Sequence, residues 1–298
     1  MAALRGRDVG AGLPDVAILG SGAVGGLIGA ALTRAGIDTA LITREKTAER
    51  LTRDGLQISS PVFGERDVAV SARPRLTEPT GALIVAVKAP QLTAALQRIE
   101  VEPGVVVSLL NGVEHLAELR ERFGDRVVAA TVRVQAHRES PTHVVHRAPF
   151  LIVAIADPGA RDLAEALTAA GIEVLAGGTE THVLWAKLSR LAALALATAG
   201  ADAPLGAVRP EAEAAAREVV AVANAEGAGL DPEAIVAELR GLPDAATSSL
   251  RGDLAAGAPD HELDAIGGAV LRAAARRGLP VPRTEALVAR VAARAAEG

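Results

Sequence analysis

A lysine and an arginine stand three residues apart in the apolar stretch LWAKLSRLAALALATAG, residues 184–200. Alanine and leucine favour a helix, and in a helix Lys187, Arg190, Leu191 and Leu194 lie along one stripe, because positions i, i+3, i+4 and i+7 share a face. A partly buried ammonium group could stabilise negative charge that develops on a reacting oxygen and supply a proton to it. The alternative is structural: both charged groups reach water from the rim of a buried helix.

A second group of residues is typical of phosphate binding. In VAILGSGAVGGLIGAAL, a G-x-G-x-x-G pattern follows a strand-like run and opens a helical one. The first glycine of such a pattern allows a tight turn, the second lets the backbone approach a pyrophosphate, and the third allows close packing of helix on strand. The helix N-terminus then offers free N–H groups to the phosphates. The loop predicted to bind a dinucleotide comprises Gly20, Ser21, Gly22, Ala23, Val24 and Gly25.

The end of the second strand-like run, ALITREK, bears on which dinucleotide binds. An NAD site usually has an acidic residue there for the ribose hydroxyl, whereas a 2′-phosphate favours cations. Thr43 and Arg44 occupy this place, with Lys46 beyond and Glu45 between them. The sequence therefore predicts NADPH rather than NADH.

Composition excludes several other classes of protein. The 298 residues include one Trp, three Phe, no Tyr and no Cys, and the net charge is −5. The absence of Cys excludes disulfides and thiolate sites, and the absence of Tyr excludes reductases that use a Tyr-x-x-x-Lys pair. We expect no nucleic-acid partner, because there is no basic stripe and there are few aromatic residues. No histidine pair has metal-helix spacing, so we expect no metal; no apolar run is long enough for a membrane span, so we expect a cytoplasmic protein.

The pattern of elements changes along the chain. Up to about residue 179, short β-branched runs alternate with helical ones, which indicates βαβ units and a parallel sheet. The expected strands are 15–20, 38–43, 82–88, 104–110, 126–134, 142–147, 150–156 and 172–177. From residue 180 onward only helical patterns occur, at 184–200, 209–227, 231–241, 261–278 and 284–298. We therefore predict an α/β Rossmann domain over 14–179 and an all-α domain over 180–298, with a flexible arm at 1–13.

Four further segments join the glycine loop in a recognisable order. They are VAVKAPQ at 85–91, LLNGVEHL at 109–116, WAKL with TAGADAPLGAV at 198–208, and TSSLRGDLAAGAPDHELDAIGG at 247–268. With them, the chain from about residue 14 onward resembles the ketopantoate reductase (2-dehydropantoate 2-reductase) family. The resemblance implies a Rossmann domain and a helical domain, with the active site in the cleft between them and a role in pantothenate biosynthesis.

The resemblance also implies roles for individual residues. Lys88 and Asn111 match positions near the nicotinamide and its ribose, and Asn111 is also counted toward the substrate site. Lys187 matches the catalytic lysine, which protonates the carbonyl oxygen as hydride reaches the carbon. Burial is expected to lower the pKa of this lysine toward ambient pH.

Two residues near the C-terminal end complete the implied site. Ser249 matches the serine that holds the substrate carboxylate, and Glu262 matches the acid near the substrate hydroxyl and the lysine. One extra residue is inserted before Glu262, so His261 is the alternative occupant. The structural alternatives are a helix cap for Ser249 and a first-turn acid for Glu262.

The chain departs from the family one and two turns after the lysine. Family members usually carry asparagines there that help to bind substrate, and this chain has Leu191 and Ala195. Arg190 could compensate as a clamp on a substrate carboxylate. The alternative is that Arg190 points to solvent or pairs with an acid on the Rossmann domain.

Three functions remain open at this level. The first is NADPH-dependent reduction of a 2-oxo acid to a 2-hydroxy acid, with ketopantoate as the default substrate. The second keeps fold and cofactor but acts on a more apolar ketone, enone or imine, as Leu191 and Ala195 suggest. The third is a non-catalytic NADP(H)-binding protein, which the presence of Lys187, Ser249 and Glu262 disfavours. The expected partner is a small-molecule substrate, and the expected state is a monomer or a homodimer.

Overall fold

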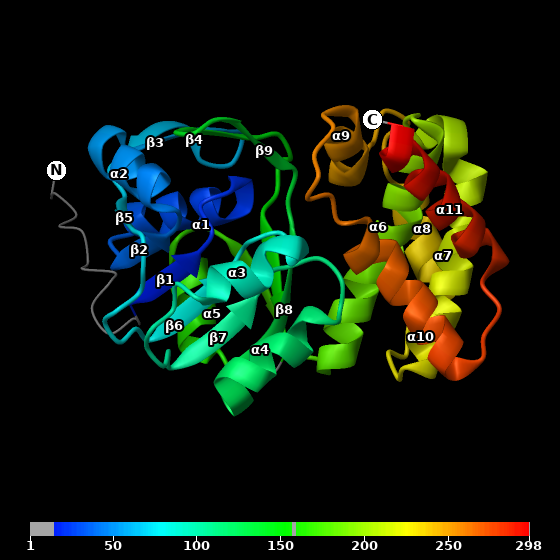
Figure 1. Cartoon of the computed structure of the whole chain (residues 1–298), viewed down its shortest axis with the longest axis horizontal. Coiled ribbons are helices and arrows are strands. Elements are labelled where there is room, and N and C mark those ends of the chain that lie inside the picture. Colours follow the sequence, from blue (N-terminus) through cyan, green and yellow to red (C-terminus); the bar gives the residue numbers. More distant parts are fainter. Residues whose placement is uncertain (1–14, 157–158, 298) are drawn as a thin grey trace, which may run out of the picture. The chain divides into compact units, whose positions relative to one another are not determined.

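The computed structural model describes residues 15–156 and 159–297 (Figure 1), so the arm expected at 1–13 lies outside the described residues. The chain forms two compact units. The first unit contains the residues up to Val87, together with Gln91–Leu110 and Leu116–Gly178. The second contains Lys88–Pro90, Asn111–His115 and the residues from Thr179 onward. Two short segments of the N-terminal half thus belong to the C-terminal unit.

An eight-stranded sheet forms the centre of the first unit, with the order β12-β11-β8-β7-β6-β1-β2-β5. The strands from β5 to β8 are all parallel, and β11 joins β8 in the antiparallel direction. The strand bounds are β1 Val16–Leu19, β2 Thr39–Ile42, β5 Ser71–Arg73, β6 Ala82–Val85, β7 Val105–Ser108, β8 Val127–Arg133, β11 Ile152–Ile155 and β12 Glu173–Ala176. Strands β1 and β6 are buried along their whole length, as expected for a parallel sheet covered on both faces. The predicted Rossmann-type core is therefore confirmed.

Five helices accompany this sheet: α1 Ala23–Arg34, α2 Glu45–Asp54, α3 Leu92–Leu96, α4 His115–Phe123 and α5 Arg161–Ala169. Their places agree with the helical runs expected between the strands. Helix α1 packs closely, because a run of its residues from Gly25 to Leu32 is buried. The parallel strands β1 and β2 end beside the start of α1, so the glycine loop lies at the carboxyl edge of the sheet.

A second, four-stranded sheet in the first unit was predicted only in part. Its order is β4-β3-β10-β9, with bounds β3 Leu56–Ser60, β4 Gly64–Val68, β9 Ala136–Ser140 and β10 His143–His146. Only β10 was expected from the sequence. Strands β4 and β9 carry mostly exposed or half-buried polar residues, so they lack the apolar pattern of a buried strand.

The second unit is helical. Its helices are α6 Glu180–Ala201, α7 Leu205–Ala225, α8 Pro232–Arg240, α9 Ser249–Ala255, α10 Ala269–Arg277 and α11 Pro282–Glu297. Asp231 caps α8, its side chain accepting from the N–H of Glu233 at 2.9 Å, as the Asp-Pro pair predicts. Helix α9 was expected only in the structural alternative in which Ser249 caps a helix. The single helix expected at 261–278 is instead a π-helical turn, Asp264–Gly268, followed by α10.

Helix α7 begins four residues earlier than expected, at Leu205, and contains Pro210. Hydrogen bonds to residues outside the helix hold its first turn. The backbone N–H groups of Leu205 and Gly206 donate to the carbonyls of Ala246 and Asp244, at 2.8 and 2.9 Å. These contacts stabilise a turn that the proline alone would not predict.

Small side chains build the core of this unit. Helices α6 and α7 pack side by side (Figure 1), and fully buried alanines on both helices, Ala192, Ala193, Ala212 and Ala216 among them, line the core. Trp185 of α6 is also buried there. Helix α6 is long and apolar enough to meet the composition of a membrane span, but 72% of its apolar window is buried inside the structure. It is the core helix of the second unit.

The close contact of α6 and α7 makes volume at the buried alanines critical. We expect Ala216→Leu to lower the free energy of unfolding by about 1–3 kcal/mol, because the added atoms overpack a fully buried position. Ala221→Leu, on an exposed position of the same helix, should change it by less than about 0.5 kcal/mol. Urea unfolding of both variants measures the difference; equal stability would contradict tight packing at Ala216.

Candidate active site

The glycine loop has the geometry that its sequence predicts. Gly20 has a φ of 106°, and a Cβ there would lie 2.7 Å from the carbonyl oxygen of Ala86. A Cβ on Gly25 would lie 2.0 Å from the carbonyl oxygen of Gly20. A Cβ on Gly22 would meet nothing within 4 Å. Gly20 and Gly25 are thus needed by the fold, whereas Gly22 borders open space.

This open space fits a dinucleotide phosphate. Gly22 is the N-cap of α1 and supplies no side-chain cap, so the first N–H groups of a twelve-residue helix point toward the loop without an intrahelical partner. Ser21 donates from Oγ to Thr43 Oγ1 at 2.9 Å, which connects the loop to the end of β2. The residues present therefore fit the phosphates of a nicotinamide dinucleotide.

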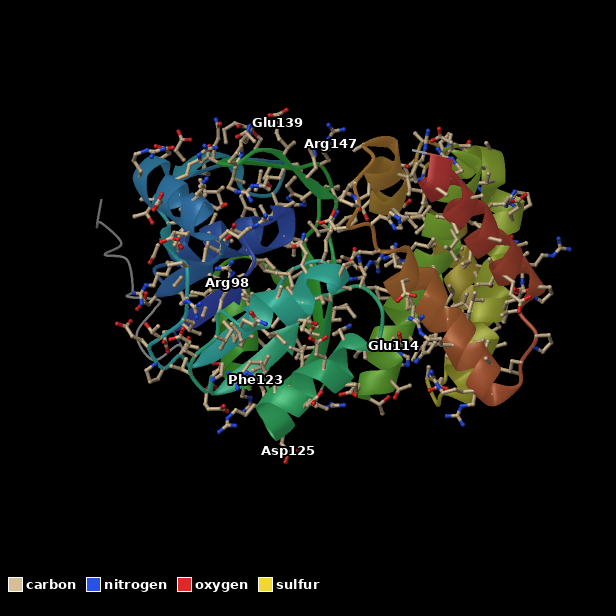
Figure 2. All side chains as sticks on the ribbon, viewed as in Figure 1. Arg98, Glu114, Phe123, Asp125, Glu139 and Arg147 are labelled. Carbon is tan, nitrogen blue, oxygen red and sulfur yellow. The ribbon has the colours of Figure 1, made fainter. Side chains whose placement is uncertain are left out.

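Arginines gather beyond the end of β2. Arg44 is the exposed N-cap of α2, and Arg50 lies on the same helix. Arg138, on β9 of the small sheet, is half-buried; burial lowers the pKa of its guanidinium, and the positive charges of Arg44 and Arg50 lower it further. Arg98 (labelled in Figure 2) reaches the carbonyl of Thr43 at 3.5 Å. Sequence reasoning found Arg44 but missed Arg138, because β9 has no apolar pattern and pairs only through β10.

A buried carboxylate organises the second unit. Glu262 is 7% exposed. Its Oε1 accepts from the backbone N–H of Ala89 at 3.2 Å, and its Oε2 accepts from Nδ2 of Asn111 at 2.8 Å. Glu262, rather than its alternative His261, is the residue that contacts Asn111.

Lys187 of α6 lies within the electrostatic reach of this carboxylate. Burial lowers the pKa of Lys187 to about 8; the charge of Glu262 opposes that change and the charge of Arg190 adds to it. An ammonium group with a pKa near ambient pH is well matched to donate a proton, since both protonation states are accessible. This combination of a lysine and a carboxylate was predicted from the sequence.

Lys88 is held by two acids, neither of which was predicted as its partner. Its Nζ contacts Asp253 Oδ1 at 3.0 Å and Asp260 Oδ1 at 3.3 Å. Burial alone would lower the pKa of Lys88, but the two carboxylates outweigh it and the pKa is raised. Lys88 is therefore a permanent cation. Asp260 lies in the segment that carries the inserted residue. This insertion is the sequence signal that could have indicated Asp260.

The predicted substrate residues next to Lys187 differ in exposure. Ala195 is fully buried in the core, and Leu191 is half-buried against it. Arg190 pairs through Nε with Glu238 Oε2 at 3.3 Å. The alternative of an acidic partner is thus correct, but the acid lies on α8 of the helical unit rather than on the Rossmann domain.

Two neighbouring serines have different surroundings. Ser248 is the N-cap of α9: its Oγ accepts from the N–H of Arg251 at 3.3 Å and lies 2.9 Å from Thr198 Oγ1. Ser249 follows as the first helical residue and is exposed. The cap expected of Ser249 is thus made by Ser248, which leaves the Ser249 hydroxyl at the surface.

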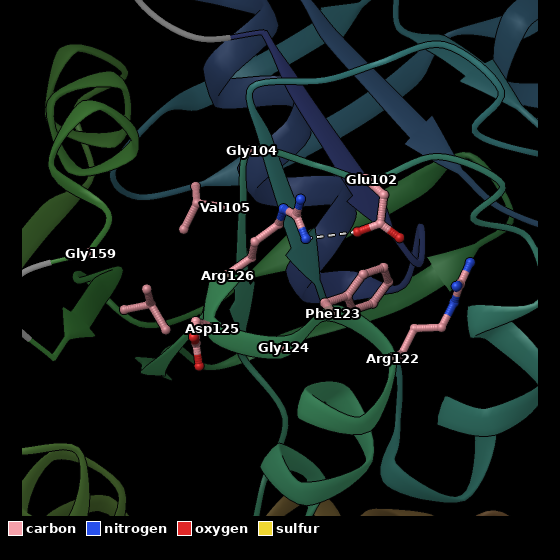
Figure 3. A pocket seen from close by; sticks show the side chains of 10 residues that line it. Glu102, Gly104, Val105, Arg122, Phe123, Gly124, Asp125, Arg126 and Gly159 are labelled. Carbon is pink, nitrogen blue, oxygen red and sulfur yellow. Dashed lines mark hydrogen bonds and ion pairs between the residues drawn. The ribbon is translucent and has the colours of Figure 1, made fainter.

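A surface pocket elsewhere in the first unit lies apart from these residues. Figure 3 shows Glu102, Arg122, Phe123 and Arg126 around it, with Arg126 Nη1 bonded to Glu102 Oε2 at 2.9 Å. It borders the amino ends of β7 and β8, the edge of the sheet opposite to the glycine loop. In open α/β sheets, ligands bind outside the carboxyl ends of the strands.

A dinucleotide loop on a Rossmann sheet, together with a lysine and a carboxylate on a helical unit, defines a nicotinamide-dependent oxidoreductase. The models of the ketopantoate reductase PanE/ApbA family match residues 16–156, and those of its C-terminal domain match residues 181–295. The chain therefore belongs to the ketopantoate reductase family.

Individual relatives agree with this assignment. A 2-dehydropantoate 2-reductase of Caulobacter vibrioides is 29% identical over 295 residues, which cover 93% of this chain and 98% of that protein. The PanE/ApbA family ketopantoate reductase of Ralstonia eutropha superposes with a TM-score of 0.83 at 28% identity, over 95% of this chain and 99% of that one. D-mandelate dehydrogenase, solved with NADH and anilino(oxo)acetate, has the same fold, with a TM-score of 0.87 at 20% identity over 95% and 99% of the two chains.

The glycines give a matched test of cofactor binding. We expect Gly22→Ala to keep the melting temperature of the free protein, because the new methyl group enters open space, and to weaken NADPH binding about tenfold or more by obstructing the phosphates. Gly25→Ala should destabilise the free protein itself by about 1–3 kcal/mol. Thermal unfolding with and without NADPH measures both effects. If NADPH raised the melting temperature of Gly22→Ala as much as that of the unmutated protein, the phosphate site at the glycine loop would be contradicted.

Proposed function

We propose that this protein reduces a 2-oxo acid to a 2-hydroxy acid with NADPH in the cytoplasm, and that ketopantoate is the first substrate to test. The observation that carries the proposal is the ammonium of Lys187, whose pKa burial lowers to about 8, a value that suits a proton donor, together with the anchored carboxylate of Glu262. The name of the Caulobacter relative supports the substrate, and family membership supports the reaction type.

Each protein group has a distinct part in this reaction. When bound, the nicotinamide supplies hydride to the carbonyl carbon. Lys187 donates a proton to the carbonyl oxygen and stabilises the charge that develops there. Glu262 favours the charged form of Lys187, because its negative charge opposes the effect of burial on the pKa of the lysine. Ser249, exposed at the start of α9, would hold the substrate carboxylate, and Lys88 and Asn111 would bind near the nicotinamide ribose.

The preference for NADPH rests on the arginines beyond β2. Arg44, Arg50 and Arg138 bring positive charge to the place where a Rossmann fold presents the ribose 2′ position. Arginine suits a phosphate because its planar fork can donate two parallel hydrogen bonds. The acid next to Arg44 is Glu45, which is the first residue of α2.

A second candidate is reduction of a carbonyl or imine with a more apolar side chain. Leu191 lies one turn after Lys187 and is half-buried, where the family usually has a polar amide. A site that has lost a hydrogen-bonding group discriminates less against substrates that lack the matching polar group. This alternative concerns substrate choice and leaves the roles of Lys187 and the cofactor unchanged.

The cofactor preference has a charge-reversal test. We expect Arg44→Glu to raise the Kd of NADPH about tenfold to a hundredfold, because a charge-assisted contact to the 2′-phosphate becomes a repulsive one, and to leave the Kd of NADH within about twofold. Arg53→Ala is the control, since Arg53 of the same helix is bonded to Asp54. Fluorescence titration measures the Kd of both cofactors. An equal loss of affinity for NADPH and NADH would contradict 2′-phosphate recognition.

The reaction itself is tested by the pH dependence of NADPH oxidation with ketopantoate. We expect kcat to fall as pH rises through about 8, because only the protonated form of Lys187 donates, and Lys187→Ala to lower kcat about a hundredfold or more with unchanged NADPH affinity. Glu262→Gln should move this descending limb to lower pH, since the charge that raises the pKa of Lys187 is removed.

Substrate choice is read from the same assay. Turnover of a 2-oxo acid with an apolar side chain, but not of ketopantoate, would favour the second candidate. Binding of NADPH without turnover of any carbonyl or imine would contradict catalysis.

A further inference from the structure

Helix α9 is too short to fix its own position. It has seven residues, Ser249–Ala255, of which only Leu250 is buried. An isolated helix of this length is unstable in water, so contacts with neighbouring elements decide where its first residue lies. Helix α9 packs beside α6 in the second unit (Figure 1), and Leu250 contributes to the core of that unit. An apolar contact of this kind sets the depth of the helix but not its orientation, because it is non-directional.

Two buried hydroxyl groups hold the start of α9 against α6. Thr198 of α6 is completely buried, and Ser248, the N-cap of α9, is 8% exposed. Thr198 Oγ1 and Ser248 Oγ lie 2.9 Å apart. A second polar contact joins the two helices, from Arg251 Nε to Asp202 Oδ1 at 2.9 Å. That ion pair is open to solvent, where such pairs contribute little, so the buried hydroxyl pair is the stronger directional contact.

The neighbours of the two hydroxyl groups determine which of them donates. Thr198 donates from Oγ1 to the carbonyl of Leu194, one turn earlier in α6, at 2.7 Å. Each hydroxyl has one hydrogen, so the hydrogen between the two side chains comes from Ser248. Ser248 Oγ in turn accepts from the N–H of Arg251 at 3.3 Å. Both hydroxyl hydrogens are thus used, and rotation of Ser248 would break two hydrogen bonds in a buried place.

The backbone enters α9 along α6. The carbonyl of Ala246 accepts from the N–H of Leu205, the first residue of α7, at 2.8 Å. Two residues later, Ser248 contacts Thr198, which lies seven positions before Leu205. The chain therefore runs from the C-terminal end of α6 toward the half of α6 that carries Lys187.

We propose that Thr198 positions Ser249 to hold the carboxylate of the substrate. The inference rests on the proposed function, in which Ser249, exposed at the start of α9, binds this carboxylate. Thr198 fixes Ser248, the residue directly before Ser249, and the peptide linkage between the two serines transmits its position. Thr198 is completely buried, so it acts through Ser249 and touches neither substrate nor cofactor. Helix α6 thereby carries the proton donor Lys187 and also anchors the group that binds the carboxylate.

Substrate kinetics test this role. Thr198→Val keeps the shape of the side chain but removes the acceptor of Ser248. We expect the KM of ketopantoate to rise about tenfold and kcat to change less than about twofold, because binding of the carboxylate is weakened and Lys187 is unaltered. The descending limb of the pH profile should stay in place for the same reason. Thr198→Ser keeps the hydroxyl and should restore the wild-type KM.

Thr284→Val is the matched control. Thr284 of α11 is also completely buried, and its Oγ1 donates to Glu218 Oε2 at 2.9 Å. Thr284→Val and Thr198→Val both remove a buried hydroxyl group, so both should lower the melting temperature. Only Thr198→Val should raise the KM. An equal rise of the KM in the two variants would mean a general loss of packing and would overturn the inference.

A double-mutant cycle shows whether Thr198 acts through Ser249. We expect Ser249→Ala to raise the KM about tenfold or more, and the addition of Thr198→Val to change it further by less than about twofold, since the serine to be positioned is gone. Effects that multiply would overturn the inference. The methyl ester of the same 2-oxo acid lacks the carboxylate charge, so its KM should be equal in the wild type and in Thr198→Val.

Hydrogen exchange gives a measurement independent of activity. We expect the amides of Ser249–Ala255 to exchange faster in Thr198→Val than in the wild type, and at the wild-type rate in Thr284→Val. Unchanged exchange in Thr198→Val would overturn the role of Thr198 in holding α9. Failure of the wild type to reduce any 2-oxo acid would contradict the proposed function and this inference together. Turnover in the wild type with an unchanged KM in Thr198→Val contradicts this inference alone.

Discussion

The carboxylate of Glu262 is a charge buried inside a helical unit, and it is stable there only because other groups compensate it. Removing an ion from water costs several kcal/mol unless hydrogen bonds and an opposite charge replace the solvent. Ala89 and Asn111 supply the hydrogen bonds, and Lys187 supplies the charge. The three come from segments far apart in the sequence, so satisfying one carboxylate brings together the loops after β6 and β7 with helix α6.

This requirement also explains why two short segments of the N-terminal half belong to the helical unit. Lys88–Pro90 and Asn111–His115 follow the carboxyl ends of adjacent parallel strands, and both contribute to the ionic and hydrogen-bonded cluster around Glu262 and Asp253. A Rossmann sheet regularly presents loops at this edge. Here the two short segments are held by Glu262 and Asp253, which belong to the same unit as these segments and as Lys187.

The sequence predicts those parts of the fold whose signals are local. Most strands of the large sheet are short apolar runs, and the glycine loop combines a turn, a strand and a helix within ten residues. The edge strand β5, Ser-Ala-Arg, is not apolar and was not expected. Strands β4 and β9 were missed because they are polar, and β9 joins the small sheet through β10, whose other neighbour, β3, lies more than eighty residues earlier in the chain. The site divides in the same way. Lys187, Glu262 and Asn111 follow from motifs, whereas Asp260 and Arg138 act through contacts that neither spacing nor periodicity encodes. Ser248 lies inside a recognised segment, yet its contact with Thr198 becomes apparent only in three dimensions.

The sparse aromatic content of the chain gives it an unusual optical property. Trp185 is the single tryptophan, there is no tyrosine, and the indole is buried in α6 two residues before Lys187. Nearly all intrinsic fluorescence excited at long wavelength therefore originates in the core of the helical unit, and the Rossmann unit contributes almost none. The emission of the native protein reports on the surroundings of the helix that carries the proposed proton donor, so a shift in that emission distinguishes events in one unit from events in the other without any label.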